Sequence, residues 1–238
     1  MNILVVAAHP DDEIIGMGGT LKKLSKKHSI KILFLAEGIT SRRNSGHVNS
    51  AKYDVSRTEL EKMNNEIIIR NNHATNALHL LNIKNIKFLD FKNLETDQLP
   101  LLKIVKEIEN EIKKTKCDTI FTHHYNDLNL DHRNAYEATI TAARPLPESK
   151  IQKILSFEIP ASTSWRHPYN FKPNVFVDIS KELSFKIKAL KQYKNEIRKF
   201  PNPRSSEATT AIAKHWGSLS GFKAAESFEL IYDRISKF

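Results

Sequence analysis

Residues 2–19 read NILVVAAHPDDEIIGMGG, and this stretch decides the fold. Asn2–Ala8 is a nearly continuous apolar run rich in β-branched side chains, which is typical of a strand buried on both faces of a parallel sheet. The run leads directly into a polar turn, His9–Glu13, and a helix is expected over Gly18–Lys27. The glycines behind the turn allow that helix, or a ligand, to approach the backbone closely.

The same alternation of strand and helix continues along the chain. Further strands are predicted at Ile30–Ala36, Ile86–Phe91 and Asp118–Thr122, and helices in a segment ending at Leu81, at Leu99–Lys114 and at His132–Ala143. Alternation at this spacing indicates βαβ units with right-handed crossovers. We therefore predict an α/β fold with a Rossmann-like, doubly wound, mainly parallel sheet and helices on both faces.

The pattern after Pro145 is less regular. Strands are predicted at Ile154–Ile159, Val175–Ile179 and around Phe228–Tyr232, and helices at Ser180–Lys199 and Ser206–Leu219. The length of 238 residues fits one domain. We expect a single domain, 1–238, in which residues 1–145 form the Rossmann-like core and residues 146–238 elaborate it and complete the substrate pocket.

The chain is basic, with a formal net charge of +10. Its lysines are scattered through helical stretches and interleaved with glutamates, which favours a solvated surface over a site for a polyanion. We therefore expect no nucleic-acid partner, although a phosphorylated or nucleotide-linked substrate would be attracted by this charge. A homo-oligomer is left open.

Cysteine content and hydropathy bear on the compartment. The one cysteine, Cys117, excludes an intrachain disulfide and a multi-cysteine metal cluster. Met1–Ala8 lacks the basic start of a signal peptide and is followed at once by acidic residues, and no apolar run approaches the ~20 residues of a membrane span. The expected location is the cytoplasm.

Two polar clusters are predicted to lie at the same edge of the sheet. His9, Asp11 and Asp12 follow the first strand, and residues 122–133 (THHYNDLNLDHR) follow the fourth. Ligands of open parallel sheets bind beyond the carboxyl ends of the strands. Closely packed acceptor groups suit a divalent cation, and nitrogen with oxygen ligands suits zinc, so His9 and Asp12 could supply two ligands and the second cluster a third.

Other interpretations of these clusters remain open. Asn129 or Asp131 could cap the helix expected near His132. The glycines at positions 16, 18 and 19 could belong to a phosphate loop, but the preceding acidic residues would repel a pyrophosphate and the dinucleotide fingerprint is not matched.

The first cluster, Ala8–Glu13 with Gly18–Thr20 behind it, resembles the motif of the PIG-L/LmbE-like zinc-dependent de-N-acetylases. Asp131–Arg133 and, more weakly, Ala225–Phe228 match further family motifs in order and spacing. The resemblance spans most of the chain. It implies a Rossmann-like metal hydrolase that removes an acyl group, acetyl above all, from the nitrogen of an amino sugar or sugar conjugate.

Carried over by position, the resemblance implies His9, Asp12 and His132 as metal ligands and Asp11 as general base. It also implies that Arg70 lies at the substrate mouth. The ion would be Zn²⁺, one per chain, although the same ligands suit Fe²⁺.

The chain departs from the family at Asn129, where many members have a histidine. An amide cannot titrate, but its NH₂ group can donate to an oxyanion. Asp131 would orient a histidine or cap the helix, and the amine would take its proton from Asp11, His123, His124 or His215. His124, Arg42 and Arg43 are further candidates for contacts with the substrate, the two arginines because they suit a phosphate or carboxylate.

Two rival functions also fit this pattern. One is a metal-dependent esterase or amidase acting on another acylated small molecule. The other is a non-catalytic Rossmann-like binding domain.

Overall fold

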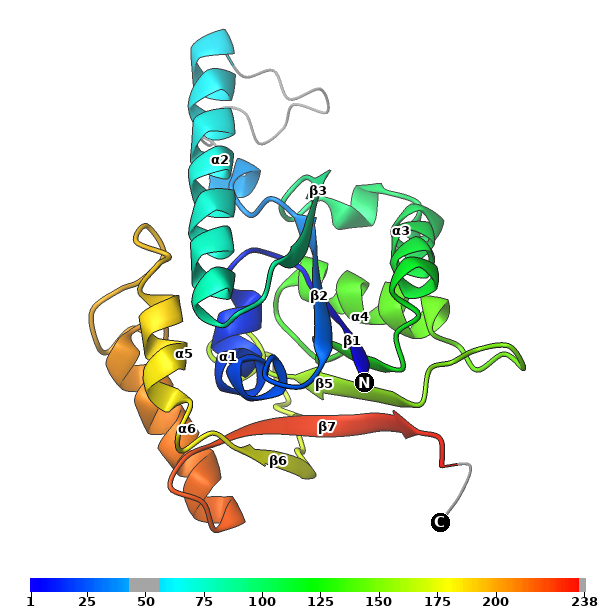
Figure 1. Cartoon of the computed structure of the whole chain (residues 1–238). Coiled ribbons are helices and arrows are strands. Elements are labelled where there is room, and N and C mark those ends of the chain that lie inside the picture. Colours follow the sequence, from blue (N-terminus) through cyan, green and yellow to red (C-terminus); the bar gives the residue numbers. More distant parts are fainter. Residues whose placement is uncertain (43–55, 236–238) are drawn as a thin grey trace.

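The structure is a computed structural model that describes residues 1–42 and 56–235 (Figure 1). Arg43, one of the predicted substrate contacts, lies outside the described residues. The described residues form a seven-stranded sheet in the order β3-β2-β1-β4-β5-β7-β6. The strands are β1 (Asn2–Ala7), β2 (Ser29–Ala36), β3 (Asn85–Phe91), β4 (Thr119–His123), β5 (Lys153–Phe157), β6 (Val175–Asp178) and β7 (Ala225–Asp233).

The predicted α/β architecture is confirmed. Strands β1 to β5 are parallel, and only β7 is antiparallel to its neighbours β5 and β6. The C-terminal strands therefore extend the same sheet. The helices are α1 (Asp12–Leu24), α2 (Arg57–Leu80), α3 (Leu101–Thr115), α4 (Leu130–Ala142), α5 (Leu183–Leu190) and α6 (Ser206–Ser220).

Helices cover both faces of the sheet, and each face has its own hydrophobic core (Figure 1). Side chains of α1, α2 and α5 pack on one face, against residues such as Val5 and Phe34. Side chains of α3 and α4 pack on the other, against residues such as Leu4 and Ile120. Successive side chains of β1 point to opposite faces of the sheet, and both faces are buried, so the strand carries an uninterrupted apolar run.

The first helix begins earlier than predicted, at Asp12 rather than Gly18, and it is interrupted at Met17 (φ −146°, ψ 24°). The interruption exposes the backbone N–H groups of Gly19 and Thr20, which donate to Glu226 at 2.9 and 2.6 Å. Glu226 also pairs with the buried ammonium of Lys186 at 2.6 Å. The second half of α1 is thus capped by a carboxylate from β7.

The helix predicted over Ser180–Lys199 was too long. The observed helix, α5, ends at Leu190, and turns follow it. Two side chains in those turns point inward. Tyr193 donates to Glu13 at 2.5 Å, and Glu196 binds three arginines. Tertiary contacts therefore override the helical periodicity of this segment.

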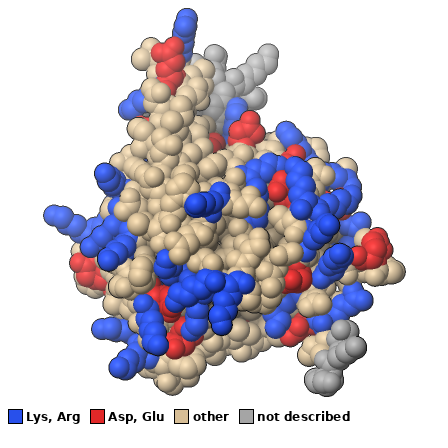
Figure 2. Space-filling model, viewed as in Figure 1, with Lys and Arg blue, Asp and Glu red and all other residues tan. Residues whose placement is uncertain are grey.

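Charged side chains are spread over the visible face of the molecule, with Asp and Glu among the Lys and Arg (Figure 2). Among the described residues, no helix is long and apolar enough to cross a membrane.

Candidate metal centre

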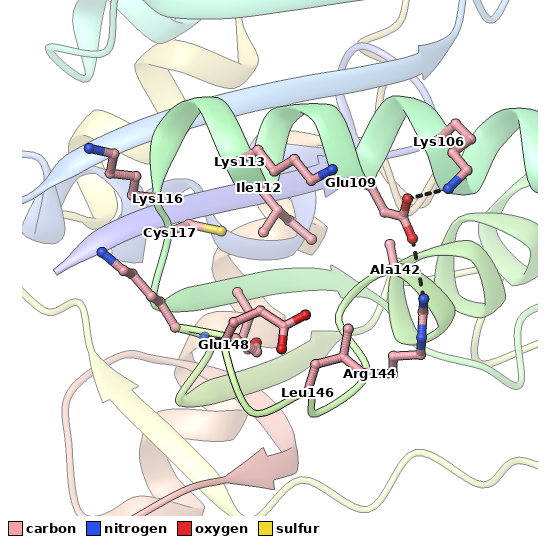
Figure 3. A pocket seen from close by; sticks show the side chains of 13 residues that line it. Lys106, Glu109, Ile112, Lys113, Lys116, Cys117, Ala142, Arg144, Leu146 and Glu148 are labelled. Carbon is pink, nitrogen blue, oxygen red and sulfur yellow. Dashed lines mark hydrogen bonds and ion pairs between the residues drawn. The ribbon is translucent and has the colours of Figure 1, made fainter.

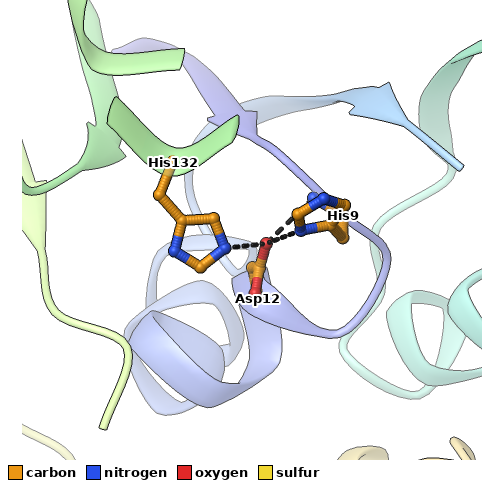
Figure 4. A group of neighbouring side chains, drawn as sticks. All are labelled: His9, Asp12 and His132. Carbon is orange, nitrogen blue, oxygen red and sulfur yellow. Dashed lines mark hydrogen bonds and ion pairs between the residues drawn. The ribbon is translucent and has the colours of Figure 1, made fainter. Parts of the chain in front are cut away.

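The two polar clusters meet at one edge of the sheet. His9 lies just beyond the end of β1, and His132 lies in the first turn of α4, which follows β4. Because β1 and β4 are neighbouring parallel strands, their carboxyl ends open on the same side. Asp12, the first residue of α1, lies between the two histidines (Figure 4).

The geometry of His9, Asp12 and His132 suits a single metal ion. Nδ1 of His9 and Nε2 of His132 each lie 3.3 Å from Oδ2 of Asp12, and one ligand atom from each residue falls within 4.8 Å of the others. Ligands held tetrahedrally at about 2.0 Å from zinc are about 3.3 Å apart. The second oxygen of Asp12 is buried and has no hydrogen-bond partner among the described residues.

The charge around this group also favours a cation. The three residues are nearly closed off from solvent, with exposures of 5% for His9, 1% for Asp12 and 3% for His132. Burial alone would lower the pKa of His132, but the carboxylates of Asp12 and Asp127 raise it to about 10. The carboxylates thus require a positive charge among them, which a divalent ion supplies.

In each of the two histidines, an aspartate contacts the ring nitrogen that does not face Asp12. Asp131 lies 2.8 Å from Nε2 of His9, and Asp127 lies 3.2 Å from Nδ1 of His132. A carboxylate that accepts one ring N–H leaves the other ring nitrogen free to bind a metal. Both aspartates are anchored in turn. Asp131 accepts from Leu94 N and Thr96 Oγ1, and Asp127 accepts from Ser162 Oγ and Thr163 Oγ1.

Asp11 lies beside the three candidate ligands in an unusual conformation. Its backbone has φ 116°, a value that residues other than glycine adopt only when their surroundings enforce it. Both carboxylate oxygens are buried, and neither has a hydrogen-bond partner among the described residues. Burial raises the pKa of Asp11, and the charges of Arg204 and Arg70 offset part of that rise.

Arg70, for which the family resemblance implied a place at the substrate mouth, lies beside Asp11. Its guanidinium is buried and donates to the carbonyl of Pro10 at 3.0 and 2.8 Å and to that of Gly38 at 2.8 Å. Nη2 also lies 3.4 Å from Oδ1 of Asp11. Arg70 therefore holds the turn that carries Asp11. A Cβ atom on Gly38 would lie 2.8 Å from its Cζ, which explains the glycine there.

The structure gives Asn129 and His123, the last residue of β4, defined local roles. Asn129 is the N-cap of α4, and its Oδ1 accepts from the backbone of Asp131 at 2.9 Å. His123 is buried, its Nε2 accepts from Ala8 N, and burial lowers its pKa to about 3. It is therefore a poor proton donor.

Three further residues were predicted from the sequence, His124 and Arg42 as substrate contacts and His215 as a source of the amine proton. His124 is fully buried, with Nε2 3.2 Å from Glu229, so it offers no surface to a substrate in this structure. Arg42 is partly exposed but paired with Glu196 at 2.7 Å. His215 is exposed on α6, with its ring against Trp216.

Sequence reasoning gave no role to Asp127, Glu196 or Arg204. Asp127 could have been found, because it stands in the same polar segment as His132 and a metal-bound histidine usually has a carboxylate behind it. Glu196 and Arg204 carry no such signal. They belong to an irregular segment, and only the fold brings them to Asp11.

Two cavities of about 430 Å³ lie at the opposite edge of the sheet from the metal centre. One of them opens where Cys117 precedes β4 and Ile151 precedes β5, and lysines and arginine line its rim (Figure 3). Neither contains a residue of the metal centre. The candidate metal centre is therefore separate from both of these cavities.

Comparison with known proteins gives relatives of this chain. The family described as GlcNAc-PI de-N-acetylase (PIG-L) matches residues 4–143, which include every residue of the His9–Asp12–His132 group. The chain is 29% identical over 238 residues to diacetylchitobiose deacetylase from Thermococcus kodakarensis, with 96% of this chain and 82% of that protein covered. It is 28% identical over 199 residues to YaiS of Escherichia coli K12, named an uncharacterized deacetylase, with 81% and 90% covered.

The fold itself is shared more widely. GalB, the 4-carboxy-2-hydroxymuconate hydratase of Pseudomonas putida KT2440, superposes with a TM-score of 0.72 at 17% identity, over 100% of this chain and 99% of that one. At this identity the likeness shows the fold alone. A function must therefore be argued from the side chains of the site.

Proposed function

The chain belongs to the GlcNAc-PI de-N-acetylase (PIG-L) family, and on that premise we propose that it is a zinc-dependent N-deacetylase. It would remove an acetyl or other acyl group from the nitrogen of an amino sugar or sugar conjugate. The observation that carries the proposal is the meeting of three metal-type donor atoms and one unbonded, buried carboxylate, Asp11, at one edge of the sheet. Both sequence relatives are named as deacetylases, which supports the same class of reaction.

In this proposal His9, Asp12 and His132 hold the ion, Zn²⁺ or Fe²⁺. Bound there, the ion would acidify a water molecule and polarise the acyl carbonyl. Asp131 and Asp127 fix the orientation of the two imidazoles and so direct the correct nitrogens at the ion.

Asp11 is the proposed general base. Its carboxylate adjoins ligand Asp12 in the chain, and neither oxygen is engaged in a hydrogen bond. Burial raises its pKa, which makes the carboxylate a stronger base toward a water proton. The same group would then return the proton to the departing amine, because His123 is held neutral as an acceptor.

Asn129 is the proposed stabiliser of the oxyanion. Its Oδ1 is used as the helix cap, and its Nδ2 group has no partner among the described residues. The Nδ2 group, at the N-terminus of α4, could therefore donate to the developing negative charge. In this arrangement Oδ1 of Asn129 caps the helix and Nδ2 of the same side chain donates to the oxyanion.

The remaining parts of the proposal concern the substrate and the chain as a whole. We treat residues 1–238 as one catalytic domain whose C-terminal part completes the pocket, since Glu196 and Arg204 reach Asp11 and its neighbours. The partner would be a small amino-sugar substrate rather than nucleic acid. Arg42, partly exposed beside Glu196, is the proposed contact for a phosphate or carboxylate on it. A cytoplasmic location belongs to the same proposal.

The test is a screen for product release over N-acetylated sugars, nucleotide sugars and glycosides, with and without a chelator. Free amine and free carboxylate should appear in equal amounts, and the chelator should abolish both. Both products must be measured, because a hydratase shares this fold. Release of a hydroxyl group instead of an amine would identify an esterase and overturn the proposal.

A variant locates the reaction at this site. Asp11→Asn should retain zinc and lose most turnover, because the amide cannot accept the water proton. Full turnover by Asp11→Asn would remove Asp11 as the base.

A further inference from the structure

Arg204 joins the candidate site from a distant part of the chain. It lies just before α6, and its Nη1 is 3.3 Å from Oδ2 of Asp11 and 3.0 Å from Oε2 of Glu196. Its side chain is 39% exposed, whereas that of Asp11 is 1% exposed. Arg204 therefore lies between the buried carboxylate and the solvent.

The two arginines beside Asp11 do different things. Arg70 directs its short hydrogen bonds at the carbonyls of Pro10 and Gly38, so it fixes the backbone of the turn. Arg204 directs its guanidinium at two carboxylates. Because Arg70 also lies 3.4 Å from Oδ1 of Asp11, the carboxylate stands between the two arginines, with Arg204 facing Oδ2.

The side chain of Asp11 needs such a partner. Its oxygens have no hydrogen bond among the described residues, and the ion pairs described for them are with Arg70 at Oδ1 and Arg204 at Oδ2. A guanidinium near a carboxylate restrains its rotation because both groups are planar and charged. Without Arg204, Oδ2 would lose the charge that faces it.

We infer that Arg204 is a positioning residue, whose guanidinium holds the carboxylate of Asp11 in place beside the His9–Asp12–His132 group. Glu196 sets the position of the guanidinium through its own contact at 3.0 Å. The inference rests on the proposed function for its kinetic consequences. The claim that Arg204 sets the orientation of Asp11 does not depend on which substrate the protein uses.

The kinetic test compares Arg204→Ala with Arg198→Ala. Arg198 lies in the same loop region and is exposed, and the hydrogen bonds of its guanidinium to described residues go to the carbonyls of Asn195 and Ile197. Arg204→Ala should lower kcat by about 100-fold, the usual consequence of misplacing a reacting group by ~1 Å, with KM changed little. Zinc content should stay at the wild-type level. Arg198→Ala should match the wild type.

Chemical rescue separates positioning from a general structural role. Added guanidinium ion should restore part of the kcat of Arg204→Ala and leave Arg198→Ala unchanged. Arg204→Gln, which keeps a donor toward Glu196, is the second variant if the alanine variant folds poorly. A raised KM with unchanged kcat would identify Arg204 as a substrate contact and overturn the inference, as would a loss of zinc.

A measurement without substrate keeps the inference testable if the proposed function fails. In a crystal structure of zinc-loaded Arg204→Gln or Arg204→Ala, the carboxylate of Asp11 should take another rotamer or several. An Asp11 side chain that keeps its wild-type orientation and order would refute the positioning role. Absence of amine release by the wild type on every substrate would instead refute the proposed function.

Discussion

Replacing Asp131 with alanine should weaken zinc binding without removing a ligand. Asp131 accepts three hydrogen bonds, from Nε2 of His9 at 2.8 Å, Leu94 N at 2.7 Å and Thr96 Oγ1 at 2.6 Å. The first of them fixes which nitrogen of His9 carries the proton and how the ring is turned. Alanine removes all three, so the ring of His9 would be free to rotate and change tautomer.

The expected size of the effect follows from that first bond. A hydrogen bond to a charged group contributes about 1.5–3 kcal/mol. At 1.4 kcal/mol for each tenfold change, its loss corresponds to roughly a 10–100-fold rise in the Kd for zinc. This range agrees with the effect usually found when the residue behind a metal-bound histidine is removed.

Asp131→Asn should weaken binding less than Asp131→Ala. Its amide could donate to Thr96 Oγ1 while its oxygen accepts from Leu94 N and His9, so only the charge would be lost. The assay is calorimetric titration of the metal-free protein with zinc against a competing chelator. Glu137→Ala, an exposed change on the same helix, is the control. A Kd for Asp131→Ala within threefold of the wild type, in a folded protein, would refute the reasoning.

Three further predictions follow from other contacts. His132→Ala should lower the zinc content measured by atomic absorption to well below one ion per chain, because a ligand nitrogen is lost; an unchanged stoichiometry would exclude it as a ligand. Glu226→Ala should lower the free energy of unfolding in urea by about 3–5 kcal/mol, since Lys186 would stay buried without its partner; a loss below ~1 kcal/mol would contradict that. Burial raises the pKa of Glu158 above its ordinary value of 4.5, so its ionisation penalises the folded state as pH rises from 4.5 through the folded pKa. The stability of Glu158→Gln relative to the wild type should therefore increase as pH rises above 4.5, because the amide keeps an acceptor for Trp216 and carries no charge; a difference in urea midpoint that does not change with pH would contradict this.

The parts of the fold that sequence predicts well are those decided by burial. Strands such as β1 and β4 lie between two layers of helices, so their runs of apolar residues survive as a signal. The end of α5 was predicted wrongly for the opposite reason. Tyr193 and Glu196 have the spacing of a helix, but their polar groups are drawn inward to Glu13 and to the arginines.

The candidate site divides in a similar way. His9 and Asp12 are adjacent in sequence to a strand end, and His132 follows a neighbouring strand, so topology alone predicts that they meet. The position of Arg70 was not predictable, because its burial depends on the carbonyls of Pro10 and Gly38 turning toward it. Contacts with backbone groups leave no trace in the pattern of side chains.

Asp131 links three strand ends, and this makes the metal centre a product of the assembled sheet. It holds His9 after β1 and the loop of Leu94 and Thr96 after β3, and it stands in the first turn of α4 after β4. His9 and Asp131 are 122 residues apart, so their contact forms only when β1 and β4 are paired. An ion that binds the folded chain and not the unfolded one must stabilise that pairing. The carboxylates that the paired strands gather at this edge are what makes the folded edge bind a cation.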